Sequence, residues 1–237
     1  MYYVIGDVKC GKSYGDILRY LARQSNFDCP TVLYIGAAAL NHLRYKNCFE
    51  TGLVKTYKNY QFSSLNVAPF TPFTDHHAKP EKIERAFSDA DIIYFEAGDV
   101  RNLLETFERF SLKDYCVEAS RAGKLVGGLC GGGSSLAERV VHYEVESGTF
   151  IDDKGIGLIP NTAISCHIDR QDERALRLYR MRMVKDRYGF NVFGLGTSQA
   201  LCFNEKGEAV ALNPTGKIGP VILSTSGVLE ALPQQDI

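Results

Sequence analysis

The chain has 237 residues, a hydrophobic fraction of 45% and a formal net charge of −1. This is enough apolar material for one large core, so we expect a single domain over residues 1–237. The balanced charge offers no basic face for nucleic acid and favours small-molecule or peptide chemistry instead. The sequence shows neither a signal-peptide pattern nor the ~18 consecutive apolar residues of a membrane span, so we expect a cytoplasmic protein without a membrane partner.

Short apolar runs alternate with longer amphipathic ones through the first half of the chain. The pattern predicts strands at 2–5, 31–35, 91–95 and 125–129, and helices at 14–23 and 100–110. A helix over 169–187 and a tail of short strands follow, whereas 69–80 is a polar connection with solvated His76 and His77. Alternating strands and helices predict an α/β fold with a central, mainly parallel sheet flanked by helices.

The seven cysteines are an odd number, widely spaced and without a C-x-x-C pair. That usage is typical of reduced cytosolic thiols rather than of a disulfide framework or a metal site. We therefore expect no metal and no cofactor. The cysteines are Cys10, Cys29, Cys48, Cys116, Cys130, Cys166 and Cys202.

A phosphate-binding pattern follows the first predicted strand. Residues 6–13, GDVKCGKS, match G-x-x-x-x-G-K-[ST], in which backbone N–H groups surround the phosphates. Lys12 would then reach the β- and γ-phosphates, Ser13 would hold magnesium, and Glu96 would be the acid at the end of a second strand. A pattern of four positions also arises by chance, with Lys12 in solvent. A nucleotide-binding protein is therefore kept as an alternative.

The strand at 125–129 runs into Gly128-Leu-Cys130-Gly-Gly132, and a helix-like segment follows. This is the pattern of a nucleophile elbow, a strained turn that presents one side chain at the carboxyl edge of a sheet. Cys130 would attack a carbonyl carbon as a thiolate if a base lies within reach. The plainer interpretation is a glycine-rich turn with a buried cysteine.

A base and an acid for Cys130 come from the segment after the elbow. His167 ends a strand-like stretch, so it is expected at the same sheet edge as Cys130, with Cys166 packed beside it. His42 and His142 are weaker candidates. A triad also needs a carboxylate to orient the imidazole, and the sequence does not choose among several. These are Glu144, Glu146, Asp152, Asp153 and Asp169.

An oxyanion hole needs two N–H donors aimed at one oxygen. The amide of Gly131, directly after Cys130, is the first candidate. The second is Gly98, in the turn Glu96-Ala-Gly-Asp99, where glycine permits close approach of the backbone. The plainer interpretation of Gly98 is a tight turn that opens the next helix.

These motifs, in this order, resemble the dipeptidase E and cyanophycinase family of serine peptidases. The resemblance covers roughly residues 1–205 and implies a three-layer fold like that of class I glutamine amidotransferases, which is flavodoxin-like. It implies Cys130 as nucleophile, His167 as base, Gly98 and Gly131 as oxyanion hole, and Glu144 or Glu146 as acid. The residues that carry it are 32–37 (VLYIGA), 90–104 (ADIIYFEAGDVRNLL), 128–132 (GLCGG), 155–158 (GIGL), His167, Arg174 and Arg177.

Two motifs depart from the family pattern. The family's G-x-S-A-G carries Cys130 and Gly131 here, and its G-G-N-T turn reads Ala97-Gly98-Asp99-Val100. Asp99 adds a negative charge that disfavours an acidic substrate, and we place Asp99 and Arg174 on the substrate-binding wall. The sequence therefore predicts a hydrolase that cleaves an amide bond of a small peptide or amide. A non-catalytic, peptidase-like binding protein is the other alternative, and a homodimer is left open.

Overall fold

The computed structural model describes residues 1–7, 29–56, 59–67, 78–144, 147–204, 206–212, 220–223, 229–232 and 234–235. The predicted helix at 14–23, Lys12, Ser13 and Glu146 lie outside these residues, and so do His76 and His77. Within the described part of the chain, no helix has the length and apolar character that crossing a bilayer requires.

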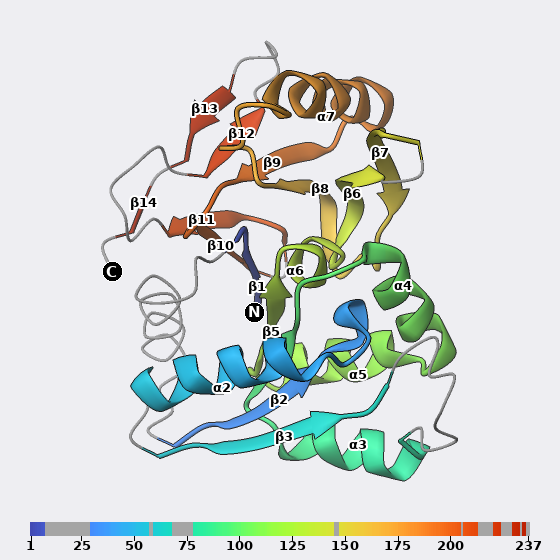
Figure 1. Cartoon of the computed structure of the whole chain (residues 1–237), viewed down its shortest axis with the longest axis vertical. Coiled ribbons are helices and arrows are strands. Elements are labelled where there is room, and N and C mark those ends of the chain that lie inside the picture. Colours follow the sequence, from blue (N-terminus) through green and yellow to red (C-terminus); the bar gives the residue numbers. More distant parts are fainter. Residues whose placement is uncertain are drawn as a thin grey trace.

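The first layer is an eight-stranded sheet in the order β14-β11-β10-β1-β5-β4-β2-β3. Five adjacent strands of this sheet run parallel to one another: β1, β5, β4, β2 and β3. Strand β10 pairs with β1 antiparallel. The mainly parallel sheet that the sequence predicted is therefore present (Figure 1). The strands are β1 (Tyr2–Ile5), β2 (Thr31–Ile35), β3 (Gln61–Leu65), β4 (Ile92–Phe95), β5 (Leu125–Leu129), β10 (Ala200–Phe203), β11 (Ala209–Leu212) and β14 (Gln234–Gln235).

Helices cover both faces of this sheet, because successive strand residues point to opposite sides. On one face Tyr34 and Tyr94 pack with Phe49 of α2 (Leu43–Thr56). On the other face Ile93 and Phe95 pack with three helices: α3 (Pro80–Asp89), α4 (Val100–Arg109) and α5 (Leu112–Arg121). Two short helices, η1 (Ala37–Ala39) and α6 (Gly131–Ser134), lie in the connections after β2 and β5. The result is a sheet between two helical layers.

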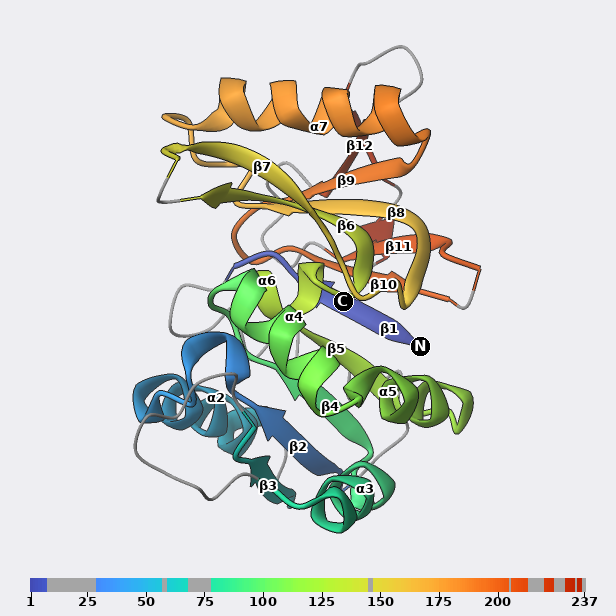
Figure 2. The ribbon, with the colours of Figure 1, turned by 90° about the vertical axis from the view of Figure 1, so that its right-hand side faces the viewer.

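A second sheet of six strands packs beside the first, in the order β13-β12-β9-β8-β6-β7. Ile164 and Phe193 on its inner side belong to the same core as Val4 and Phe203 of the eight-stranded sheet. Helix α7 (Arg174–Tyr188) covers its outer side with Met181 (Figure 2). The strands are β6 (Ala137–Glu144), β7 (Thr149–Lys154), β8 (Ile159–Cys166), β9 (Asn191–Leu195), β12 (Val221–Leu223) and β13 (Leu229–Ala231).

Candidate active site

Cys130 lies in a strained turn between β5 and α6. Its backbone has φ 48° and ψ −120°, a conformation that residues other than glycine rarely adopt. The flanking glycines are sterically required: a Cβ at Gly128 would lie 2.2 Å from the carbonyl oxygen of Phe95, and one at Gly132 would lie 2.4 Å from that of Glu96. The turn is that of a nucleophile elbow, and it holds the thiol at the carboxyl end of β5.

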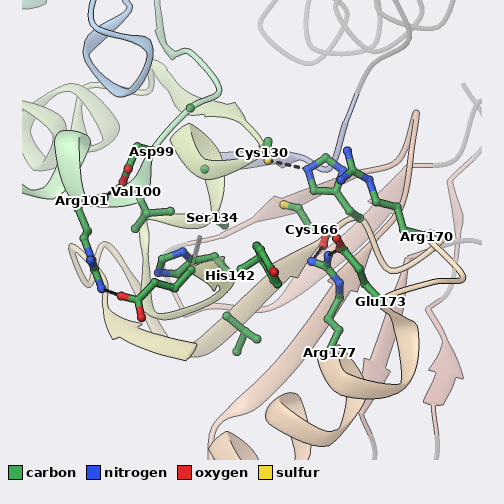
Figure 3. Close-up of a pocket in the computed structure, with 16 residues that line it drawn as sticks. Asp99, Val100, Arg101, Cys130, Ser134, His142, Cys166, Arg170, Glu173 and Arg177 are labelled. Carbon is green, nitrogen blue, oxygen red and sulfur yellow. Dashed lines mark hydrogen bonds and ion pairs between the residues drawn. The ribbon is translucent and has the colours of Figure 1, made fainter. Parts of the chain in front are cut away.

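An imidazole and a carboxylate line up behind the thiol. Cys130 Sγ is 3.0 Å from His167 Nε2 (Figure 3), and His167 Nδ1 is 3.3 Å from Asp7 Oδ2. The second contact is an ion-pair separation rather than a well-aligned hydrogen bond. His167 follows β8 with φ 62°, and Asp7 follows β1. Three segments far apart in the chain therefore form one cysteine, histidine and aspartate row.

The charges in this row stabilise one another. Hydrogen bonds from the Cys166 thiol, His167 and the Gly131 amide, with the imidazolium charge, hold the pKa of Cys130 well below its ordinary value against the effect of burial. Burial lowers the pKa of His167, but Asp7 and Cys130 outweigh it and raise that pKa to about 9. Both pKa shifts favour a thiolate and imidazolium pair, which is the reactive form of a nucleophilic cysteine.

The end of β8 is fixed by a buried cation. Arg177 of α7, with 3% of its surface exposed, donates to the carbonyl oxygen of Cys166, the residue before His167. The same guanidinium pairs with Glu173 at 2.7 Å. Because a buried charge must be paired, this arrangement couples α7 to the position of the imidazole.

The two proposed oxyanion donors lie in neighbouring turns. Gly98 has φ 149°, and a Cβ there would lie 2.3 Å from the carbonyl oxygen of Ala38. A Cβ at Gly131 would lie 2.4 Å from the carbonyl oxygen of Gly98, so the turn after β4 and the elbow touch backbone to backbone. Glycine is needed at both places, and Gly98 and Gly131 both line the cavity in front of Cys130.

The carboxylate beside the imidazole is Asp7, which the sequence analysis did not select. Glu144 forms an ion pair with Arg101 instead, and Glu146 lies outside the described residues. The other candidates also have partners of their own. Asp152 pairs with Arg139 and Arg180, Asp153 with His142, and Asp169 accepts the Thr197 amide at 3.0 Å.

A signal for Asp7 was present in the sequence. It directly follows a buried strand, and carboxyl ends of parallel strands are where ligands and reactive groups gather in open α/β sheets. Asp7 lies within the phosphate-binding pattern at 6–13, so it was interpreted as part of a nucleotide-binding loop and not as a triad acid. In the structure the Asp7 carboxylate faces His167, and the rest of that pattern from residue 8 on lies outside the described residues.

A cavity of about 440 Å³ opens in front of Cys130. Asp99 lies on its wall and also caps α4, because its side chain accepts the Arg101 amide at 2.8 Å. On the side near α7 the wall is formed by Arg170, Glu173 and Arg177. Arg174, which we expected on the substrate-binding wall, is the first residue of α7 and is not among the described residues that line this cavity. Figure 3 shows Asp99, Arg170, Glu173 and Arg177 around the cavity.

Glu96 is a buried carboxyl group directly behind the elbow. It is 3% exposed, accepts the Ala97 amide at 2.7 Å and accepts the Tyr34 hydroxyl at 3.1 Å. Burial raises the pKa of Glu96 to about 7, and the charge of Cys130 adds to that direction. The Glu96 carboxyl group therefore hydrogen-bonds inside the fold, at the turn before Gly98. It is not exposed to solvent, where the nucleotide-binding alternative would need it to hold magnesium.

A cysteine with an imidazole 3.0 Å away, at the carboxyl edge of a parallel sheet, is an arrangement suited to nucleophilic chemistry. A model of peptidase family S51 matches residues 5–210. The chain belongs to peptidase family S51, and it is a hydrolase of the peptidase class.

Solved structures agree on the fold. A peptidase from an acI-B1 Actinobacterium superposes with a TM-score of 0.63 at 18% identity, covering 84% of this chain and 81% of its own. A putative peptidase E protein from Listeria monocytogenes EGD-e superposes with a TM-score of 0.64 at 14% identity, covering 89% of this chain and 96% of its own. A search of curated proteins finds no match.

Proposed function

We propose that the protein hydrolyses an amide bond of a small peptide through a thioester on Cys130, with His167 as acid and base and Asp7 as the group that holds the imidazolium. The observation that carries the proposal is the 3.0 Å contact between Cys130 Sγ and His167 Nε2, with a carboxylate 3.3 Å behind the ring. Nucleophile, base and orienting acid in such a row are the signature of covalent catalysis.

The chemistry follows from the charges. The Cys130 thiolate attacks the carbonyl carbon, and the oxygen that becomes negative is stabilised by the amides of Gly131 and Gly98. The His167 imidazolium then protonates the leaving amine, so the C–N bond breaks and a thioester remains. Water attacks the thioester while His167 takes its proton. The acid product leaves, and the thiolate and imidazolium pair is restored.

The cavity supports a short substrate. A volume of about 440 Å³ lies in the range of pockets for small ligands, which a dipeptide or a small amide suits. Asp99 brings a carboxylate to the wall beside Gly98. We therefore expect a neutral or basic side chain next to the scissile bond, since an acidic one would be repelled.

The test is release of free amino acids from a panel of dipeptides that differ in the charge of the first residue. Wild type should cleave part of the panel, Cys130→Ala should cleave none of it, and Cys130→Ser should keep weak activity through its hydroxyl. Cys29→Ser is the matched control, because Cys29 is an exposed thiol before β2. Equal rates for wild type and Cys130→Ala would refute the thioester, and binding without turnover would favour a peptidase-like binding protein.

A further inference from the structure

A second thiol lies beside the reactive one. Cys166 is the last residue of β8, directly before His167, and it lines the cavity beside Cys130. Both side chains line the same end of the cavity, as Figure 3 shows. Hydrolysis as proposed above needs one thiol and one imidazole, so it leaves Cys166 without a chemical step.

The two sulfurs differ in charge and access. Cys130 is partly exposed to the cavity, and its pKa is held well below the ordinary value, which favours the thiolate. Cys166 is 5% exposed, and the hydrogen bond to Cys130 and burial hold its pKa well above the ordinary value. An accessible cysteine of low pKa beside one shielded thiol is the arrangement of an oxidation-sensitive cysteine with a resolving partner.

We propose that Cys130 and Cys166 form an oxidation site for small hydroperoxides, which closes as a disulfide. The Cys130 thiolate attacks the terminal oxygen of the hydroperoxide, so the O–O bond breaks and Cys130 becomes a sulfenic acid. The other oxygen takes one proton from the His167 imidazolium and leaves as water from hydrogen peroxide, or as an alcohol from an organic hydroperoxide. Cys166 then attacks the sulfenic sulfur, the S–O bond breaks, and the hydroxyl leaves as water with the Cys166 proton. The peroxide is reduced by two electrons and the two thiols are oxidised.

The other described cysteines are poor partners for this step. Cys116 on α5 and Cys202 on β10 are buried in the core, and neither is among the described residues that line the cavity beside Cys130. Cys29 and Cys48 are exposed and lie on the connection before β2 and on α2. The closed disulfide would occupy the nucleophile and protect it from irreversible oxidation to sulfinic and sulfonic acids.

The test treats the whole protein with graded hydrogen peroxide and maps the peptides by mass spectrometry. It uses a Cys29→Ser, Cys48→Ser background, which removes the two thiols that are exposed in the described part of the chain. The expected product is a cross-linked peptide pair containing Cys130 and Cys166, two hydrogen atoms lighter than the reduced peptides and restored by dithiothreitol. In Cys166→Ala, and in Cys166→Ser as a second variant, Cys130 should instead accumulate as sulfinic and sulfonic acid that dithiothreitol does not reverse. Cys116→Ala is the control and should still give the cross-link.

The wild-type pattern decides the proposal even if the Cys166 variants fold poorly. Direct passage of Cys130 to sulfinic acid, a cross-link to another cysteine, or no oxidation of Cys130 would each overturn it. The readout is a mass and not an activity. A protein that forms the disulfide but cleaves no peptide would support the oxidation site and refute the proposed hydrolysis. A protein that cleaves peptides but forms no disulfide would support the hydrolysis and overturn the oxidation site.

Discussion

The two sheets contribute to the site in different ways. The eight-stranded sheet brings Asp7, Gly98 and Cys130 from the ends of β1, β4 and β5, which are neighbours in the order β1-β5-β4. The six-stranded sheet brings Cys166 and His167 from the end of β8. The first group is held by strand pairing and backbone contact, whereas the second reaches the thiol only because the two sheets share a core.

This difference locates the weak link of the site. Backbone contacts around the elbow leave no room for even a Cβ, so the nucleophile has little freedom to move. The imidazole depends on packing between sheets and on the buried Arg177 contact behind β8. Changes on the histidine side should therefore alter reactivity, and changes behind the elbow should alter stability.

The largest expected effect is that of removing the imidazole. His167→Ala should lower turnover on the order of 10³-fold, about 4 kcal/mol in activation free energy, because one group serves as acid and base. Alkylation of Cys130 by iodoacetamide at neutral pH should also slow, since the thiolate loses its counter-ion. His42→Ala, an exposed histidine before α2, is the control. If both variants alkylate at the wild-type rate, His167 is only a structural residue.

The next effect concerns stability behind the elbow. The pKa of Glu96 is raised to about 7, so its favourable contribution is complete below the unfolded value of 4.5 and is lost as pH rises through about 7. The wild type should therefore lose on the order of 3 kcal/mol of unfolding free energy across that window relative to Glu96→Gln. Urea titrations at graded pH measure this. Glu81 is an exposed carboxylate on α3, and the unfolding free energy of Glu81→Gln should change with pH as in the wild type. If the unfolding free energy of Glu96→Gln also changes with pH as in the wild type, Glu96 is not the titrating group.

The smallest effect identifies the acid. Asp7→Asn should cost about tenfold in turnover, because loss of the carboxylate destabilises the imidazolium. The pKa of His167 should then fall below about 9, and the alkaline limb of the rate profile should move to lower pH with it. Glu144→Gln breaks an ion pair with Arg101 instead and should leave that limb in place. A limb that moves only in Glu144→Gln would return the role to Glu144.

The sequence predicted most of the elements that surround the nucleophile Cys130. The predicted strands at 2–5, 31–35 and 125–129 coincide with β1, β2 and β5, and α4 begins at the predicted Val100. These elements are set by local patterns of apolar residues, and Asp99 caps α4 through its own side chain. The turn at Cys130 was equally local, because glycines two residues to either side are what such a turn requires.

The rest of the site depended on contacts between distant segments. The sequence narrowed the base to His167 by residue type and chain order, but it did not show that the ring lies between Cys130 and Asp7. Asp7 is 160 positions from His167 and came into contact with it only because β1 pairs with β5 and β8 packs above them. Local patterns thus determined the elbow and the parallel strands. Strand order and the packing of two sheets decided which carboxylate meets the imidazole and which thiol lies beside Cys130, because contacts between distant segments leave no periodic trace in the chain.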